Sequence, residues 1–272
     1  MIIDFHAHIF PDKIADKTID ALSKISNIKA HTNGTVCGLE NSMVSSGVNI
    51  SVNLPVLTNP NQFESVTRFA LEINKNFNEN TGKIISFAGI HPNIEGIEGK
   101  TRYLKEQGFL GIKIHPDYQE TFVDDDNYYK ILKCAKDNDL IVVTHAGIDR
   151  GYIGQPIKCT PERVLKLLDR LGGYSKFVIA HLGGEELFEE TYSNLAGKDI
   201  YFDTSFVLND FGQEKFNKLL TKHGVDKILF ATDSPWRAQD AEMKILKSYG
   251  LDQEIQNKIF YKNALQLLGL EK

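Results

Sequence analysis

Short apolar runs recur along the chain, separated by longer amphipathic or polar stretches. Most of these runs are continuously apolar, which is typical of strands in a parallel sheet that is covered on both faces. Eight runs are predicted to be strands: Ile2–Ile9, Ile50–Leu57, Ile84–His91, Leu110–His115, Leu140–His145, Phe177–His181, Ile200–Thr204 and Ile228–Thr232.

The stretches between these runs are predicted to be helical. Thr160 and Pro161 show the expected start of one such helix, an N-cap residue followed by proline at the first helical position. The predicted helices are Asn61–Asn78, Glu98–Glu106, Asn127–Asn138, Pro161–Leu171, Glu185–Leu195, Asp210–Lys222, Asp240–Ser248 and a closing helix at Asp252–Leu268.

A strand followed by a helix, repeated eight times, predicts an α/β protein with a closed (β/α)8 TIM barrel of parallel strands. That fold typically has about 250 residues, so we expect residues 1–272 to form a single domain. A doubly wound open sheet is the alternative, but it would place a glycine-rich phosphate loop after the first strand, where none is found. The segment Pro11–Ser46 is long for one unit and is interpreted as an insertion over the barrel mouth, with a helix near Lys13–Leu22 and a second short helix.

Composition narrows the class of protein without identifying its substrate. The 272 residues are 42% hydrophobic and 25% charged, as in ordinary globular proteins, and the net charge is −5. A nucleic-acid partner is not expected, because it would require clustered Lys and Arg. No apolar stretch approaches the roughly 20 residues that cross a bilayer. The three cysteines show no paired spacing, which favours a reducing compartment, and we expect a cytoplasmic protein that acts on a small molecule and forms a homodimer.

Histidines gather where the predicted strands end. Six of the eight histidines in the chain follow this rule: His6, His8, His91, His115, His145 and His181. In a parallel barrel all these strand ends lie on one face, and that face is where active sites form. Histidines that only fill a core or a surface would not be expected to cluster there.

Four of the strand-end residues have the chemistry of metal ligands. His6, His8 and His145 offer neutral nitrogens, and Asp233, which follows the last apolar run, offers a carboxylate. A catalytic metal site uses three or four such ligands and lowers the pKa of bound water to about 7. Asp233 is then a candidate general base, and His181 a candidate group that orients the water or polarises a substrate carbonyl.

These motifs resemble the amidohydrolase superfamily over the whole chain. The resemblance rests on Asp4-Phe-His-Ala-His8, Thr144-His145, Ala180-His181-Leu-Gly-Gly184, Ala231-Thr-Asp-Ser-Pro235 and the closing segment Lys262–Leu270. The sequence is most similar to the small single-domain branch that includes the aminocarboxymuconate semialdehyde decarboxylase type. That resemblance implies His6, His8, His145 and Asp233 as metal ligands and His181 as the catalytic histidine.

Lys113, at the end of the fourth run, leaves two interpretations open. In some members of the superfamily a carboxylated lysine bridges two metals, and Lys113 and His181 would then bind a second ion. Otherwise one ion is bound, with zinc the expected metal, and Lys113 binds a substrate anion. Four further residues are weaker candidates for substrate contact: His91, His115, Trp236 and Arg237.

The first functional hypothesis is a metal-dependent hydrolase that attacks a small amide, ester or lactone with metal-bound hydroxide. The alternative is a non-oxidative, metal-dependent decarboxylase of a small unsaturated or aromatic acid, in which Lys113 or Arg237 holds a carboxylate. A phosphoesterase and a non-catalytic binding barrel are the remaining hypotheses. The sequence alone does not separate hydrolysis from decarboxylation.

Overall fold

The strands are short, parallel and buried. A computed structural model describes residues 1–271 of the chain. It contains β1 (Ile3–Ala7), β2 (Ile50–Asn53), β3 (Ile84–Ser86), β4 (Ala88–Gly89), β5 (Gly111–Ile114), β6 (Ile141–Thr144), β7 (Phe177–Ile179), β8 (Tyr201–Asp203) and β9 (Ile228–Leu229). Nearly all strand residues are buried, as continuous apolar runs require when both faces of a sheet are covered.

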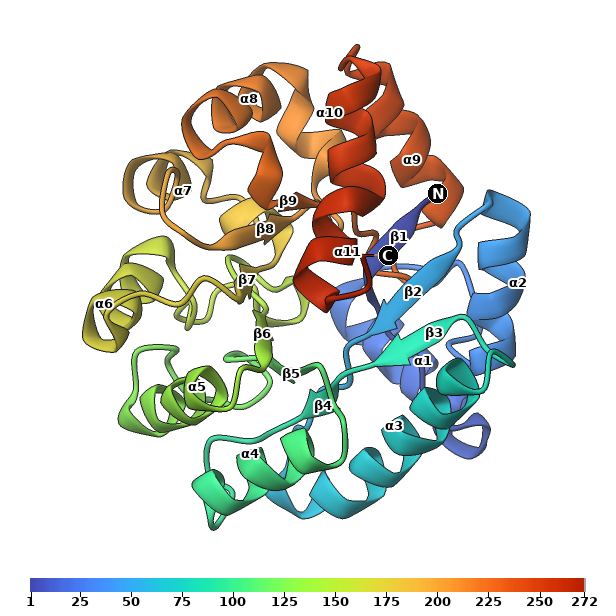
Figure 1. Ribbon diagram of the computed structural model, residues 1–272, viewed down its shortest axis with the longest axis vertical. Helices are drawn as coiled ribbons and strands as arrows, with labels where there is room; N and C mark the ends of the chain where they lie inside the picture. Colours follow the sequence, from blue (N-terminus) through green and yellow to red (C-terminus); the bar gives the residue numbers. More distant parts are fainter. Residues whose placement is uncertain (272) are drawn as a thin grey trace.

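The strands follow one another in sequence order around a common centre, with helices outside them (Figure 1). Strands β1 to β3 form one parallel sheet, and β4 to β9 form a second. β3 and β4 are halves of one predicted run, separated by Phe87, so one half pairs with β2 and the other with β5. Counting that run once leaves the eight strands that the sequence predicts.

Hydrogen bonds join the two ends of this series. The Phe5 N–H donates to the Phe230 carbonyl over 2.9 Å, and the Asp233 N–H donates to the His6 carbonyl over 2.8 Å. A parallel bridge links Ala7 with Ser234 just beyond β9. The order of the strands and these contacts agree with the predicted (β/α)8 barrel.

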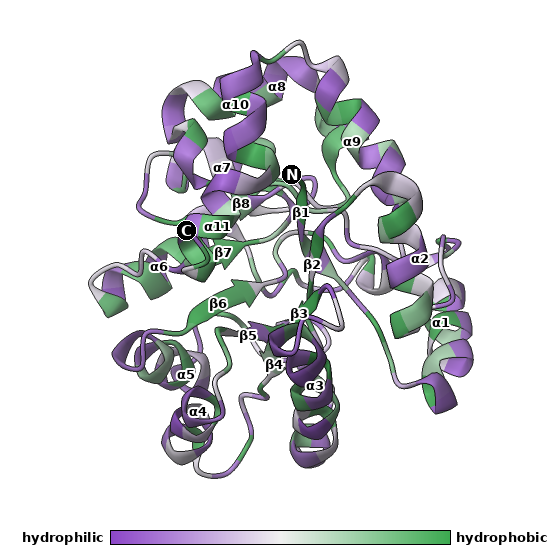
Figure 2. Cartoon of the chain, turned by 45° about the vertical axis from the view of Figure 1, so that its right-hand side comes forward, coloured by the Kyte–Doolittle hydropathy of each residue, from purple (hydrophilic) through white to green (hydrophobic). Residues whose placement is uncertain are grey.

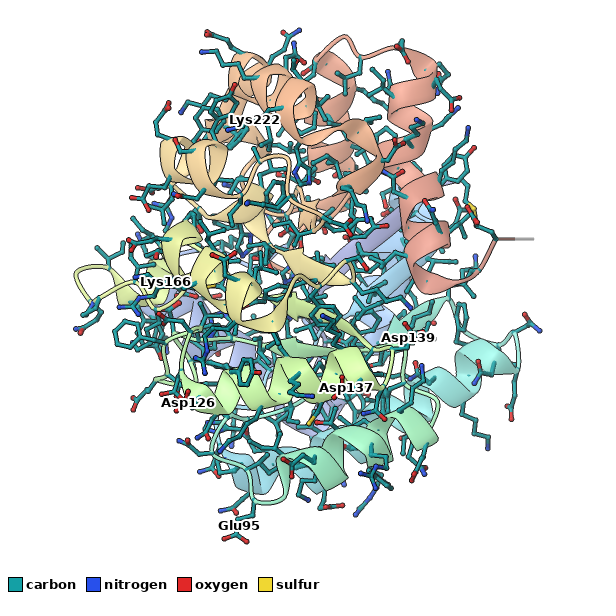
Figure 3. All side chains as sticks on the ribbon, turned by 60° about the vertical axis from the view of Figure 1, so that its left-hand side comes forward. Glu95, Asp126, Asp137, Asp139, Lys166 and Lys222 are labelled. Carbon is teal, nitrogen blue, oxygen red and sulfur yellow. The ribbon has the colours of Figure 1, made fainter. Side chains whose placement is uncertain are left out.

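The helices present an apolar side to the strands and a polar side outward (Figure 2). In Figure 3 the labelled side chains of Asp126, Asp137 and Lys166 point away from the barrel. The helices are α1 (Asp12–Ser26), α2 (Val36–Ser46), α3 (Phe63–Asn78), α4 (Ile97–Glu106), α5 (Asp126–Asp137), α6 (Pro161–Leu171), α7 (Phe188–Asn194), α8 (Leu208–His223), α9 (Gln239–Ser248), α10 (Gln253–Asn257) and α11 (Asn263–Leu268). None of the helices within residues 1–271 combines the length and the apolar character needed to cross a membrane.

The long segment after β1 divides into two parts with different positions. Helix α1 carries Ile14, Thr18 and Leu22, which line the cavity at the barrel mouth, so this part is the expected insertion. Helix α2 packs beside α9 and buries Leu39 and Met43, so it belongs to the outer layer of helices. The helix expected near residues 13–22 extends to Ser26, where Asn27 in the left-handed conformation ends it.

Candidate metal centre

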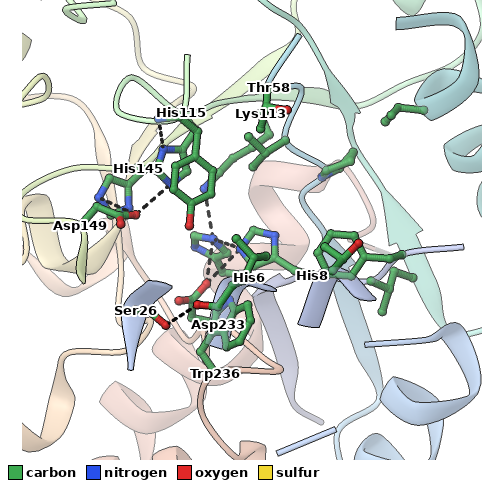
Figure 4. Close-up of a pocket in the computed structure, with 18 of the residues that line it drawn as sticks. His6, His8, Ser26, Thr58, Lys113, His115, His145, Asp149, Asp233 and Trp236 are labelled. Carbon is green, nitrogen blue, oxygen red and sulfur yellow. Dashed lines mark hydrogen bonds and ion pairs between the residues drawn. The ribbon is translucent and has the colours of Figure 1, made fainter. Parts of the chain in front are cut away.

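Two strand ends bring three potential metal ligands together (Figure 4). His6 Nε2 lies 3.2 Å from His8 Nε2, while Asp233 Oδ1 lies 3.4 Å from the former and 3.0 Å from the latter. The two histidines share a side of the extended run at β1 because side chains two residues apart point the same way. The backbone bond from Asp233 to His6 holds the carboxylate against them.

The Nδ1 atoms of His6 and His8 each donate a hydrogen bond to an acceptor outside the ligand group. His6 Nδ1 donates to Asp203 Oδ2 over 2.9 Å, and His8 Nδ1 donates to the Leu54 carbonyl over 2.9 Å. A neutral imidazole with its proton on Nδ1 has a lone pair on Nε2. Two lone pairs and the Asp233 carboxylate therefore converge on one space, which suits a divalent cation. Hydrogen bonds of this kind to the far ring nitrogen are usual in metal-binding histidines.

The pKa values favour the protonation states that a metal requires. Burial and then the charge of Lys113 lower the pKa of His6 to about 3, so this ring is neutral near pH 7. Burial opposes the ionisation of Asp233, but its contact with His8 and the attraction of His6 lower its pKa to about 2. Burial also opposes the ionisation of Asp203, while the attraction and hydrogen bond of His6 keep its pKa below the usual range. Neutral imidazole and ionised carboxylate are the metal-binding forms.

Lys113 lies directly beside this group. Its side chain is 1% exposed, and its Nζ donates to His6 Nε2 over 3.1 Å. Burial lowers the pKa of Lys113 to about 8. The amine is therefore mainly charged at pH 7, with a neutral fraction that grows as the pH rises. Its contact with His6 and its position in the cavity wall are compatible with both predicted roles, an anion-binding cation and a carboxylated bridge.

His145 and His181 form a separate contact. His145 Nδ1 lies 2.9 Å from His181 Nε2, and His181 Nδ1 donates to the Ser205 carbonyl over 3.0 Å. Within residues 1–271, the groups whose potential ligand atoms lie within 4.8 Å of one another are His6, His8 and Asp233, and, separately, His115, His145 and Asp149. The sequence predicts His145 as a fourth ligand beside His6, but the structure places it in the second group. Its role as a ligand of the first ion stays a prediction.

A glycine fixes the position of the loops that carry these two histidines. Gly147 forms a parallel bridge with Glu185, and its φ is +87°. A Cβ atom at this position would lie 2.1 Å from the Glu185 nitrogen, so any other residue would separate the two loops. The close approach keeps the chain after β6 against the chain after β7, where His145 and His181 meet.

The candidate metal centre lines a cavity of about 410 Å³. His6, His8, Lys113, His145 and His181 line its polar part. Its remaining wall is mostly apolar and comes from α1, the loop after β2, helix α3 and the loops after β8 and β9. The apolar lining residues are Ile9, Phe10, Pro11, Ile14, Leu22, Ile28, Pro55, Val56, Val66, Phe69, Phe206 and Trp236.

The structure separates the weaker candidates into two pairs. His115 and Trp236 line the cavity, as expected for substrate contact, whereas His91 and Arg237 are not among its lining residues. His91 Nδ1 accepts the N–H of Asn93 over 3.1 Å and so caps its own loop. The Arg237 guanidinium lies over the Phe206 ring at 4.3 Å. The structure thus does not support a substrate contact for His91 or Arg237 in this cavity.

Four candidate functional residues were not identified from the sequence: Asp117, Asp149, Asp203 and Ser205. Asp203 ends β8, so the rule that selected the histidines would have found it had it been applied to the seventh apolar run. Asp149 caps a turn by accepting the N–H of Gly151 over 2.7 Å. Its other oxygen faces His115 and His145, which a turn signal does not reveal.

The chain belongs to the amidohydrolase family, because the family model described as amidohydrolase matches residues 3–270. This match confirms the resemblance found in the sequence. The conclusion does not rest on curated proteins, because none of them matches the chain.

Solved structures share the fold at low sequence identity. A 2,6-dihydroxybenzoate decarboxylase from Rhizobium has 17% identity and a TM-score of 0.72, covering 100% of this chain and 99% of its own. A dihydroxybenzoic acid decarboxylase from Polaromonas sp. JS666, with bound manganese and 2-nitroresorcinol, has 15% identity and a TM-score of 0.72, covering 100% and 97%. A probable 2-pyrone-4,6-dicarboxylic acid hydrolase from Acinetobacter baumannii, with bound citric acid, has 18% identity and a TM-score of 0.67, covering 98% and 99%.

Proposed function

We propose that this member of the amidohydrolase family is a metal-dependent, non-oxidative decarboxylase of a small aromatic or unsaturated carboxylic acid. The observation that carries the proposal is the convergence of His6, His8 and Asp233 beside Lys113 in the wall of a largely apolar cavity. The sequence ranks hydrolysis first. The solved structures with this fold favour decarboxylation, since two of the three described above are named as decarboxylases.

The cavity suits a flat acid with one charged end. Phe10, Phe69 and Trp236 belong to its apolar lining and offer contacts to a ring or conjugated chain. Lys113 offers an ammonium group in the cavity wall, where a substrate carboxylate would otherwise meet the carboxylate of Asp233. An acid therefore binds with its polar groups toward the metal centre and its apolar body toward α1 and α3.

Decarboxylation breaks one carbon–carbon bond, releases CO₂ and leaves an electron pair on a carbon that must receive a proton. Asp233 and His181 both line the cavity and are the candidate groups to hold that proton. His181 takes a fixed orientation from its bond to the Ser205 carbonyl. His6, His8 and Asp233 would hold a divalent ion, whose positive charge would stabilise negative charge that develops on the substrate. Zinc stays a prediction, and manganese is the other metal to test, because the Polaromonas structure holds it.

Hydrolysis of a lactone or ester is the second candidate. It is favoured by the same residues and by the hydrolase from Acinetobacter baumannii that shares the fold. In that reaction Asp233 would accept a proton from the attacking water, and His181 would polarise the substrate carbonyl. Both reactions use the same groups, so products must separate them.

The test compares products from two matched substrate sets. Protein supplied with Mn²⁺ or Zn²⁺ is incubated with hydroxybenzoic and muconate-like acids, and separately with lactones and esters of similar size. CO₂ release from an acid, with the corresponding product lacking the carboxyl group, supports the proposal. Opening of a lactone or ester without CO₂ release from any acid would replace it with hydrolysis. Asp233→Asn, a change of nearly equal volume, serves as the inactive control.

A further inference from the structure

Helix α1 contributes a stripe of residues, spaced four apart, to the wall of the cavity. These residues are Ile14, Thr18, Leu22 and Ser26. Side chains at this spacing lie above one another on one face of a helix, so they form a continuous strip of wall. Within α1 (Asp12–Ser26) only Ala15 is buried, so the rest of the protein does not cover this stripe.

The two hydroxyl groups on the stripe are bonded inside the helix. Thr18 Oγ1 donates to the Ile14 carbonyl over 2.9 Å, and Ser26 Oγ donates to the Leu22 carbonyl over 2.8 Å. This is the usual bond from a helical Ser or Thr to the carbonyl four residues earlier. Both donors already have an acceptor, so the stripe offers a ligand mainly the hydrocarbon of Ile14 and Leu22.

Helix α3 and the loop before it form another largely apolar part of the wall. Val66 and Phe69 line the cavity and are only half-buried, so each keeps apolar surface that a ligand can cover. The hydroxyls beside them are bonded locally: Thr58 Oγ1 donates to Gln62 Oε1 over 3.3 Å, and Ser65 Oγ donates to the Gln62 carbonyl over 3.0 Å. None of the lining residues between positions 55 and 69 carries a charge.

The lysine and arginine side chains in the cavity wall leave room for one substrate carboxylate. Within residues 1–271 the lining contains one lysine and one arginine, Lys113 and Arg150. Lys113 lies beside the candidate metal centre, where it can pair with one carboxylate. Arg150 already pairs with Glu185 over 2.7 Å and with Glu186 over 2.9 Å. A second carboxylate elsewhere in the cavity would therefore lose hydration without gaining an unpaired cation.

The cavity is also larger than an acid with one ring requires. A cavity of about 150 Å³ is enough to hold benzene. The observed volume of about 410 Å³ is more than twice as large. A single ring with its carboxylate beside Lys113 would leave much of the apolar wall in contact with water, and covering that wall with hydrocarbon is favourable.

We propose that the substrate is a monocarboxylic acid with an apolar extension beyond its ring or conjugated unit, and that Leu22 and Val66 contact this extension. The inference rests on the proposed function, because it takes an acid with its carboxylate beside Lys113 as the ligand. It adds two properties of the substrate: a single charged group, and hydrocarbon that reaches α1 and α3.

The first test measures binding to the wild-type protein, so it does not depend on how any variant folds. Protein supplied with Mn²⁺ is titrated calorimetrically with 2-hydroxybenzoate, with its 4-butyl and 5-butyl derivatives, and with the two derivatives in which a carboxylate replaces the butyl group. We expect the better butyl acid to bind about tenfold or more tightly than 2-hydroxybenzoate, because each buried methylene adds to the affinity, and both dicarboxylates to bind more weakly. A smaller gain, a dicarboxylate as tight as 2-hydroxybenzoate, or no binding of any acid would overturn the proposal.

The second test locates the extension with substitutions in the wall. Leu22→Ser and Val66→Ser should each reduce the advantage of the butyl acid and leave the affinity for 2-hydroxybenzoate unchanged, because the shorter acid does not reach these residues. Ile25→Ser is the matched control: this side chain is also on α1, is 60% exposed and does not line the cavity, so the advantage should remain. An unchanged advantage in either Leu22→Ser or Val66→Ser would contradict the assigned contacts.

Release of CO₂ from the same acids is recorded separately, so the inference and the proposed function can fail independently. Tighter binding of a butyl acid without CO₂ release from any acid would support the substrate class and count against decarboxylation. Release of CO₂ from 2-hydroxybenzoate without a butyl advantage in binding would support decarboxylation and overturn the apolar extension.

Discussion

Asp203 Oδ2 accepts a hydrogen bond from His6 Nδ1 over 2.9 Å, and both side chains are almost completely buried. Asp203 also accepts from the Ser205 N–H and from the His181 N–H through its other oxygen. One carboxylate from β8 therefore orients a metal-ligand candidate on β1 and the backbone of the histidine after β7. Asp203 would act on the candidate metal centre through His6, because its own oxygens bond to His6 Nδ1 and to backbone N–H groups.

Replacing Asp203 with Asn should weaken metal binding. The amide cannot supply the charge that keeps the His6 proton on Nδ1, and losing such an outer partner typically lowers metal affinity about 10- to 100-fold. Competition with a coloured chelator measures this change. Asp199→Asn, which removes an exposed ion pair with Lys227, is the control and should leave the affinity unaltered. Equal affinity in Asp203→Asn and the wild type would exclude the orienting role.

The charge on Lys113 should control the binding of an acidic substrate. Burial lowers the pKa of this amine to about 8, so the KM for an acid should rise as the pH increases through about 8 and the ammonium is lost. Lys113→Met should raise KM about tenfold or more at pH 7, equivalent to about 1.4 kcal/mol, and should remove this pH dependence.

The competing interpretation, in which a carboxylated Lys113 bridges two metals, predicts different measurements. Carboxylation would add the mass of one CO₂ to the chain, observable by native mass spectrometry, and Lys113→Met would then lose one metal ion. Unmodified mass together with an unchanged metal count in Lys113→Met is the result expected for an anion-binding ammonium.

Trp236 and Arg237 are adjacent in sequence but should respond differently to substitution. Trp236 lines the cavity, so Trp236→Ala should raise KM about tenfold for an aromatic acid, by roughly 1.4 kcal/mol. Arg237 packs on Phe206 outside the lining, so Arg237→Ala should lower the melting temperature and leave KM nearly unchanged. A KM increase in Arg237→Ala as large as that in Trp236→Ala would show that the guanidinium contacts substrate after all.

Glu242 should make stability depend on pH. Burial raises its pKa to about 7 from the usual 4.5, although the charge of Arg237 acts in the opposite direction. Because the pKa is raised in the folded state, the stabilising contribution is complete below pH 4.5 and is lost as the pH rises through about 7. Glu242→Gln should therefore be more stable than the wild type above pH 7, by roughly 1–3 kcal/mol.

Urea unfolding at several pH values measures this difference. Glu254→Gln, at an exposed carboxylate paired with Lys262, is the control and should follow the wild type. Parallel pH profiles for Glu242→Gln and the wild type would contradict the assignment.

The barrel could be predicted because the apolar runs and the helix-capping residues indicate the same strands and helices that the tertiary structure contains. The run at Phe177–His181 is apolar and buried, and β7 forms there. Helix α6 begins at Pro161 behind the Thr160 cap and ends at Leu171, as the sequence indicates. The division of the third run into β3 and β4 was not foreseen, because it depends on pairing with two different neighbours.

For the site, the sequence could predict only which residues lie at the ends of strands. That rule places His6, His8 and Asp233 together, since their positions follow from neighbouring strands. It does not specify ring orientation, which hydrogen bonds across the barrel decide. His145 therefore faces Asp149, a residue from a loop whose path no local pattern reveals. His91 also ends an apolar run, yet it bonds to its own loop.

The most direct test of the central claim measures CO₂ release and metal content in the same sample. Wild-type protein stripped of metal should release no CO₂ from an acid that the untreated protein decarboxylates, and added Mn²⁺ or Zn²⁺ should restore the activity. Asp233→Asn should remain inactive under both conditions while keeping the circular dichroism spectrum of the wild type. Full CO₂ release from the stripped protein, or from Asp233→Asn, would contradict a metal-dependent decarboxylase built on His6, His8 and Asp233.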